Sequence, residues 1–166
     1  MTRRRYLTVT ALAAMGVAVA SAIETPTKLI WNATASAPVG FYTVEPADRI
    51  EVPELVAVMP PEPLAPFMVQ RGYVGRGVPL LKRVVGLPGQ RVCRAGRTIT
   101  VDGIEMGEAL ERDRIGRELP AWQGCRVIAP GEIFLMNWEV RDSLDGRYFG
   151  PIPASSVIGR AVPLWT

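Results

Sequence analysis

Residues 77–89, GVPLLKRVVGLPG, set one lysine, Lys82, inside an otherwise apolar run. The leucines and valines of residues 80–85 are typical of a buried strand, and the glycines and proline of residues 86–89 predict a turn after it. Burial disfavours an ammonium group. We therefore expect the pKa of Lys82 to fall from about 10.4 toward the 7–8 of a general base, at a cost on the order of 4 kcal/mol. The alternative is an edge-strand lysine whose charged end reaches water.

The composition limits which catalytic groups are available. The chain has no histidine, which excludes Ser-His-Asp and Cys-His machinery. Lys28 and Lys82 are its only lysines, and arginine stays protonated in proteins. Upstream, residues 31–42 read WNATASAPVGFY. Small hydroxyl-bearing residues followed by proline and glycine are suited to presenting a nucleophile on a tight turn.

Three segments, in this order, resemble the conserved boxes of the signal-peptidase-type serine/lysine proteases. They are SAPVG at 36–40, PLLKRVVGLPG at 79–89 and DSLDGRYFG at 142–150. The run NATAS at 32–36 is similar to the asparagine-rich box before the serine in the TraF-like branch of that family. That branch serves conjugative transfer, where it matures the pilin precursor. The resemblance covers most of residues 28–160.

The resemblance implies a nucleophile, a base and an oxyanion site. Ser36 would attack the scissile carbonyl and Lys82 would take its proton. The backbone N–H of Ser36 and the hydroxyl of Thr34 would stabilise the oxyanion. The alternatives are that Ser36 is an ordinary turn serine and that Thr34 is an ordinary strand threonine.

The third box supplies the supporting residues that the resemblance implies. Ser143 would orient the amine of Lys82, while Asp145 and Arg147 match an acidic and basic pair of the family. Because these two are two residues apart, we expect them on the same face of an extended segment, joined by an ion pair. An ordinary surface loop is the alternative.

Two positions depart from the family pattern. Residues 136–141, MNWEVR, lack the Gly-Asp-Asn run of many signal peptidases, which leaves the alignment of Asp142 open. Gln90 stands where the family has aspartate after Leu-Pro-Gly, and we expect it to affect the fold more than the chemistry.

Length and composition indicate one medium domain. The chain has 166 residues, 48% of them hydrophobic, which is enough for a core. Its formal charge of +3 equals that of residues 3–5, RRR, so the remainder is neutral overall and no nucleic-acid surface is expected. Without histidine, and with no EF-hand or similar spacing, we expect no metal and no cofactor.

Residues 1–23 combine the three arginines with an apolar run from 6 to 23, just long enough to span a bilayer. The positive-inside rule would then place residues 28–166 in the periplasm, as a catalytic domain on an inner-membrane anchor. A cleavable signal peptide is the alternative, because residues 18–20 and 20–22 both read A-x-A. The resemblance favours an anchor.

Cys93 and Cys125 are the only cysteines. An oxidising periplasm would let them form a disulfide worth about 3–4 kcal/mol in the chain-entropy model. Two unrelated buried thiols remain the main alternative. A catalytic cysteine is disfavoured because there is no histidine to activate it.

Short strands with glycine and proline between them predict a mostly-β, barrel-like domain behind an N-terminal helix. The resemblance implies the signal-peptidase and LexA-like catalytic fold. A type I′ hairpin is expected at Asp102-Gly103. Prolines make a helix implausible between 53 and 66, whereas a short helix is expected over 108–114. Besides residues 80–85, strands are expected at 28–31, 41–44, 55–59, 98–101, 104–106, 125–128, 133–137 and 157–163.

Two function classes follow. The first is a membrane-associated serine/lysine endopeptidase that matures a small exported protein, in the TraF-like branch a pilin precursor, with release of a linear or a head-to-tail cyclic product. A general type I signal peptidase is its variant. The second is a catalytically silent periplasmic scaffold of the conjugation apparatus, but a buried lysine opposite a serine argues against silence. Oligomeric state is not predicted.

Overall fold

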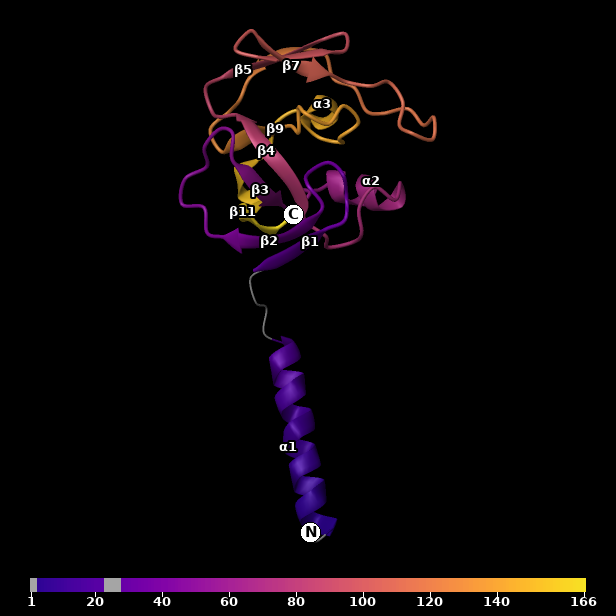
Figure 1. Cartoon of the computed structure of the whole chain (residues 1–166), viewed down its shortest axis with the longest axis vertical. Helices are drawn as coiled ribbons and strands as arrows, with labels where there is room; N and C mark the ends of the chain where they lie inside the picture. The colour runs from indigo at the N-terminus through magenta and orange to yellow at the C-terminus, as the bar shows by residue number, and fades with distance from the viewer. Residues whose placement is uncertain (1–2, 23–27) are drawn as a thin grey trace.

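The computed structural model describes residues 3–22 and 28–166. The first element is the helix α1, Arg3–Ala22, which precedes the β domain (Figure 1). Within the described ranges, no helix is both long enough and apolar enough to cross a membrane. Residues 1, 2 and 23 of the expected anchor lie outside the described ranges, so the choice between an anchor and a cleaved signal stays a prediction.

The main sheet has seven strands in the order β1-β2-β11-β3-β4-β9-β10, all paired antiparallel. The last long strand along the chain, β11, therefore lies between two early ones, β2 and β3. The strands are β1 Leu29–Asn32, β2 Gly40–Glu45, β3 Leu55–Val58, β4 Leu80–Gly86, β9 Glu132–Leu135, β10 Ile152–Pro153 and β11 Val157–Trp165.

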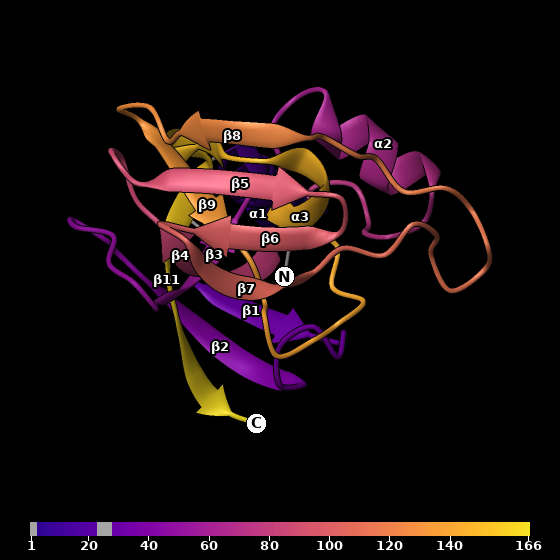
Figure 2. The same cartoon turned by 90° about the horizontal axis from the view of Figure 1, so that it is seen from above.

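A smaller four-stranded sheet, in the order β7-β6-β5-β8, covers one end of the main sheet (Figure 2). Its strands are β5 Arg91–Ala95, β6 Thr98–Val101, β7 Ile104–Glu108 and β8 Gly124–Val127. The expected hairpin at Asp102-Gly103 is confirmed. Both residues have positive φ, 49° and 81°, as a type I′ turn requires.

Strand β4, the stretch that contains Lys82, joins the three parts of the core. Leu81 packs with residues of β1, β2 and β11 under the first hairpin. Val84 belongs to the centre of the main sheet. Val85 packs between the two sheets. A strand that contributes to all three clusters is held from several directions, so Lys82 sits on a rigid element.

The expectation that prolines exclude a helix between 53 and 66 is wrong. A short helix, α2, spans Leu64–Gln70. Pro63 is its N-cap and Pro66 its third residue, where a backbone N–H has no partner within the helix. The missing N–H of Pro66 therefore removes no helical hydrogen bond.

The helix expected over 108–114 is also wrong. Glu108 ends β7, and the chain then forms a loop in which Arg112 and Glu118 make an isolated bridge. The carboxylate of Asp113 accepts hydrogen bonds from the backbone N–H groups of Ile115 and Arg117. Such side-chain bonds compete with helical ones and stabilise the turn instead.

The fold class is as expected: mostly β, with one N-terminal helix. Four elements were not predicted from the sequence: β5, β10, the 3₁₀ turn Ala154–Ser156 and the short helix α3, Gly146–Phe149.

Candidate active site

Ser36 lies on the turn between β1 and β2, and Asn32 holds that turn in shape. The side-chain amide of Asn32 donates to the carbonyls of Thr34, Ala37 and Pro38. Its oxygen accepts from the backbone N–H of Thr34 at 3.1 Å. A single buried side chain thus satisfies four backbone groups, which explains why a segment of small residues keeps one conformation.

The hydroxyl of Ser36 lies 3.1 Å from that of Thr34. Thr34 also donates to the side-chain oxygen of Asn32, at 2.9 Å. That oxygen can only accept, and a hydroxyl has one proton to give, so Ser36 is the donor in its contact with Thr34. For Thr34 to serve an oxyanion, its proton must turn away from Asn32.

Lys82 projects from the middle of β4 and is 5% exposed. Its ammonium Nζ donates to the hydroxyl Oγ of Ser143 at 2.7 Å. Burial lowers the pKa of Lys82 to about 8, with the charge of Asp145 opposing the shift and that of Arg147 adding to it. A hydrogen bond to Ser143 leaves the lone pair of a neutral amine free for another proton.

Asp145 and Arg147 form a buried ion pair, but not on the extended segment that the sequence analysis expected. Asp145 is the N-cap of α3 and accepts from the backbone N–H of Arg147. The guanidinium folds back onto the same carboxylate, with contacts of 2.9 and 2.8 Å. A Cβ at Gly146 would lie 2.6 Å from the carbonyl oxygen of Leu135, so only glycine fits between the pair.

Arg147 also holds the loop before Ser143. Its guanidinium donates to the carbonyls of Asn137, Val140 and Arg141. Burial by itself would lower the pKa of Arg147, but the hydrogen bonds and charge of Asp145 raise it above its ordinary value. The loop that carries Ser143 is therefore fixed by a permanent cation.

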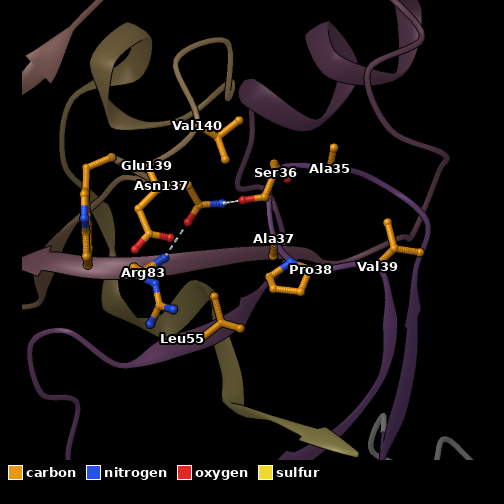
Figure 3. A pocket seen from close by; sticks show the side chains of 11 residues that line it. Ala35, Ser36, Ala37, Pro38, Val39, Leu55, Arg83, Asn137, Glu139 and Val140 are labelled. Atoms are coloured by element: carbon orange, nitrogen blue, oxygen red, sulfur yellow. Dashed lines mark hydrogen bonds between the residues drawn. The ribbon is translucent and has the colours of Figure 1, made fainter. Parts of the chain in front are cut away.

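Two hollows meet at Ser36. The larger, of about 1020 Å³, is lined by Thr34, Ser36, Lys82 and Ser143, and also by the loop after β7. The smaller, of about 340 Å³, is lined by Ser36 together with Arg83, Asn137 and other residues (Figure 3). Among the described residues no hydrogen bond joins Ser36 to Lys82. Catalytic contacts are often long before substrate binds.

Asn137 is a site residue that the sequence analysis placed only at the end of a strand. Its side chain is buried between Ser36 and Arg83 and is hydrogen-bonded to both (Figure 3). A polar side chain directly after the apolar run of β9 was the available signal, because a buried amide needs partners.

The structure joins Cys93 and Cys125 in a disulfide between the paired strands β5 and β8. Neither cysteine lines either of the two hollows at Ser36. Among the described residues there is no group of three or more metal-binding side chains.

A model of the family "Signal peptidase, peptidase S26" matches residues 2–165. The chain belongs to the S26 signal peptidase family. A conjugal transfer protein TraF of Agrobacterium fabrum is 38% identical over 147 residues, covering 81% of each chain. A plasmid transfer protein TraF of Escherichia coli is 33% identical over 147 residues, covering 81% of this chain and 82% of its own. A crystal structure of a signal peptidase I from Enterococcus faecalis aligns with a TM-score of 0.39 at 23% identity. It covers 68% of this chain and 98% of its own.

In this member of the S26 family, Gln90, which departs from the family pattern, and Asp142, whose alignment the sequence left open, both contact other residues of the structure. Gln90 accepts from the backbone N–H of Leu87 and donates to Asp102, and so fastens the turn after β4. Asp142 forms an ion pair with Arg114 of the loop after β7. The contact of Gln90 lies at the far end of β4 from Ser36, whereas Asp142 and Arg114 both line the larger hollow.

Proposed function

We propose that this chain is a serine endopeptidase with a Ser36/Lys82 dyad that matures an exported precursor during conjugation. The observation that carries the proposal is the buried amine of Lys82. Its pKa is lowered to about 8, and it is held by Ser143 in the wall of the hollow that also contains Ser36. Burying a lysine without an ion pair costs folding free energy. A role as general base, which needs a lowered pKa, explains why a lysine occupies this position.

In the proposed reaction the neutral amine of Lys82 takes the proton of Ser36 as the serine oxygen attacks the scissile carbonyl. The tetrahedral oxyanion receives hydrogen bonds from the backbone N–H of Ser36 and from Thr34, whose hydroxyl turns from Asn32. The ammonium of Lys82 then protonates the leaving amine. A second nucleophile releases the acyl group from Ser36 and restores the serine.

The substrate we propose is a pilin precursor. Support comes from the TraF names of the relatives and from the box order. Release by water gives a linear product, and release by the N-terminal amine of the substrate gives a cyclic one. The proposed location of residues 28–166 is the periplasm at the inner membrane. The disulfide supports it, because disulfides persist in oxidising compartments.

The experiment co-expresses the full chain with the pilin precursor of the same conjugative element and follows the product by mass spectrometry. S36A, K82A and K82R should each leave the precursor unprocessed. K82R keeps the positive charge but provides no base near neutral pH. A cyclic product weighs one water less than the linear one. Near-normal processing by K82A would refute the dyad.

The second candidate, a silent scaffold of the conjugation apparatus, differs in one measurable way. It predicts that conjugation frequency survives S36A and K82A, because only the surface of the domain would matter. The peptidase predicts that both variants lose conjugation together with processing.

A further inference from the structure

The side chain of Asn137 joins the segment of the nucleophile to the segment of the base. Its amide nitrogen donates to the carbonyl of Ser36 and, at 3.1 Å, to that of Leu81. Its amide oxygen accepts from the backbone N–H of Arg83 at 2.9 Å. Carbonyls on one side and an N–H on the other fix the orientation of the amide.

The two groups on β4 are the peptide groups on either side of Lys82. The carbonyl of Leu81 precedes it and the N–H of Arg83 follows it. In a sheet these groups would bind a neighbouring strand. The neighbour β9 has already ended at Leu135, so the side chain of Asn137 continues the ladder in place of a backbone. On its other edge β4 is paired with β3, with Lys82 opposite Val56. Asn137 therefore holds the backbone around Lys82 on the one edge where β9 no longer pairs with it.

The backbone of Asn137 is held as firmly as its side chain. Its N–H donates to the carboxylate of Asp145 at 3.1 Å, and its carbonyl accepts from the guanidinium of Arg147 at 3.1 Å. Asn137 is 5% exposed. One residue therefore connects the Ser36 turn, the Lys82 strand and the buried ion pair next to Ser143.

We propose that Asn137 is a positioning residue for the peptidase reaction: it sets the separation and the direction of the serine hydroxyl relative to the amine of Lys82. The inference rests on the proposed dyad. It adds a specific claim, that pairing with β3 alone does not set the alignment and that the side-chain amide of Asn137 is needed to complete it. Asn137 takes no proton and touches no reacting atom.

The test measures Ser36 acylation in the purified full chain with p-nitrophenyl acetate, a small activated ester that releases nitrophenolate. Because the ester is small, the measured rate does not depend on contacts that an extended peptide substrate would make with the protein. N137L removes all three side-chain bonds. N137D keeps the size of the side chain and the acceptor for Arg83, but loses the donors to Ser36 and Leu81. If N137L fails to fold, the acylation rate of N137D tests the positioning role of Asn137.

The matched control is Q90L. Gln90 also clamps backbone near one end of β4, through Leu87, and lies outside both hollows. Rates are expressed per folded molecule, from urea unfolding and circular dichroism, and corrected with S36A. We expect the plateau rate of N137L and N137D to fall about 100-fold, the scale of a misplaced catalytic group. The pH midpoint of N137L should be unchanged. The added carboxylate of N137D should raise the pKa of Lys82, so only its plateau is compared. Q90L should keep the wild-type rate.

Each result bears on one claim. Wild-type acylation rates in S36A and K82M would overturn the proposed function itself. If those two are inactive but N137D or N137L matches Q90L per folded molecule, only the positioning role of Asn137 is refuted. A wild-type plateau rate in N137L with a pH midpoint moved toward 10.5 also refutes the positioning role. Asn137 would then act by excluding water from Lys82 and not by aligning it.

Discussion

The most demanding prediction is that K82M is at least as stable as the wild type near neutral pH, and that this advantage disappears at alkaline pH. Folding lowers the pKa of Lys82 from 10.5 to about 8, chiefly through burial. At about 1.36 kcal/mol for each pKa unit, the folded state carries a penalty of about 3.4 kcal/mol for the charged amine. Methionine has a stem of similar reach and no charge.

The sign follows from proton binding. Below pH 8 the lysine is protonated in both states, so the full penalty applies. Between pH 8 and 10.5 the unfolded chain binds more protons than the folded one, so stability rises with pH. The penalty is about 3.4 kcal/mol at pH 6.5 and about 0.8 kcal/mol at pH 10. The wild type should therefore gain about 2.5 kcal/mol relative to K82M over that range.

The assay is urea unfolding of both proteins, with the disulfide intact, at pH 6.5 and pH 10. Because K82M shares every other titrating group, the difference between the two free energies of unfolding isolates Lys82. A difference independent of pH, or a large loss of stability in K82M, would refute burial of a neutral base. The companion measurement is acylation against pH, which should rise through a midpoint near 8. A flat profile from about pH 6 to 10 would refute the same reasoning.

Three further variants test other parts of the site and of the fold. T34V should lower acylation by about 100- to 1000-fold while T34S restores most of it, since one oxyanion donor is lost and regained; equal rates in both would exclude Thr34 from the oxyanion site. D145N should cost about 3–5 kcal/mol in urea unfolding, because Arg147 stays buried without its carboxylate, and should move the acylation midpoint to lower pH by removing a charge that raises the pKa of Lys82. A cost under about 1 kcal/mol would contradict that burial argument. The double variant C93S/C125S should lose about 3–4 kcal/mol yet keep its acylation rate per folded molecule, and two free thiols in the native chain would rule out the disulfide.

The parts of the fold that sequence could predict are those set by local pattern. The apolar run around Lys82 is a buried strand, and Asp102-Gly103 forms its turn because both residues tolerate positive φ. The prediction that prolines exclude a helix between 53 and 66 failed at Pro66. The cost of a proline depends on its position in a helix, and in the first turn the backbone N–H makes no helical hydrogen bond that proline could remove.

Contacts between site residues that are near each other in sequence could be predicted. Contacts between residues that are far apart in sequence were less predictable. Asp145 and Arg147 pair within two residues, although through a helix cap rather than an extended segment. Asn137 reaches Ser36 from 101 residues away. Nothing in the local pattern of an asparagine after a strand specifies which backbone it will bind, since that depends on how the sheet is assembled.

The position of β11 sets an order of assembly for the catalytic centre. The hairpin with Ser36 belongs to β1 and β2, and Lys82 belongs to β4, which pairs with β3. In the part of the chain that the structure describes, β11, residues 157–165, is the one strand that pairs with both β2 and β3. The β1–β2 pair and the β3–β4 pair both precede β11 in the sequence, so the sheet that unites them is completed only when β11 has been synthesised. A chain that ends before residue 157 would contain Ser36 and Lys82 but not the strand that holds their two strand pairs in one sheet, so the peptidase activity proposed above should require residues 157–165.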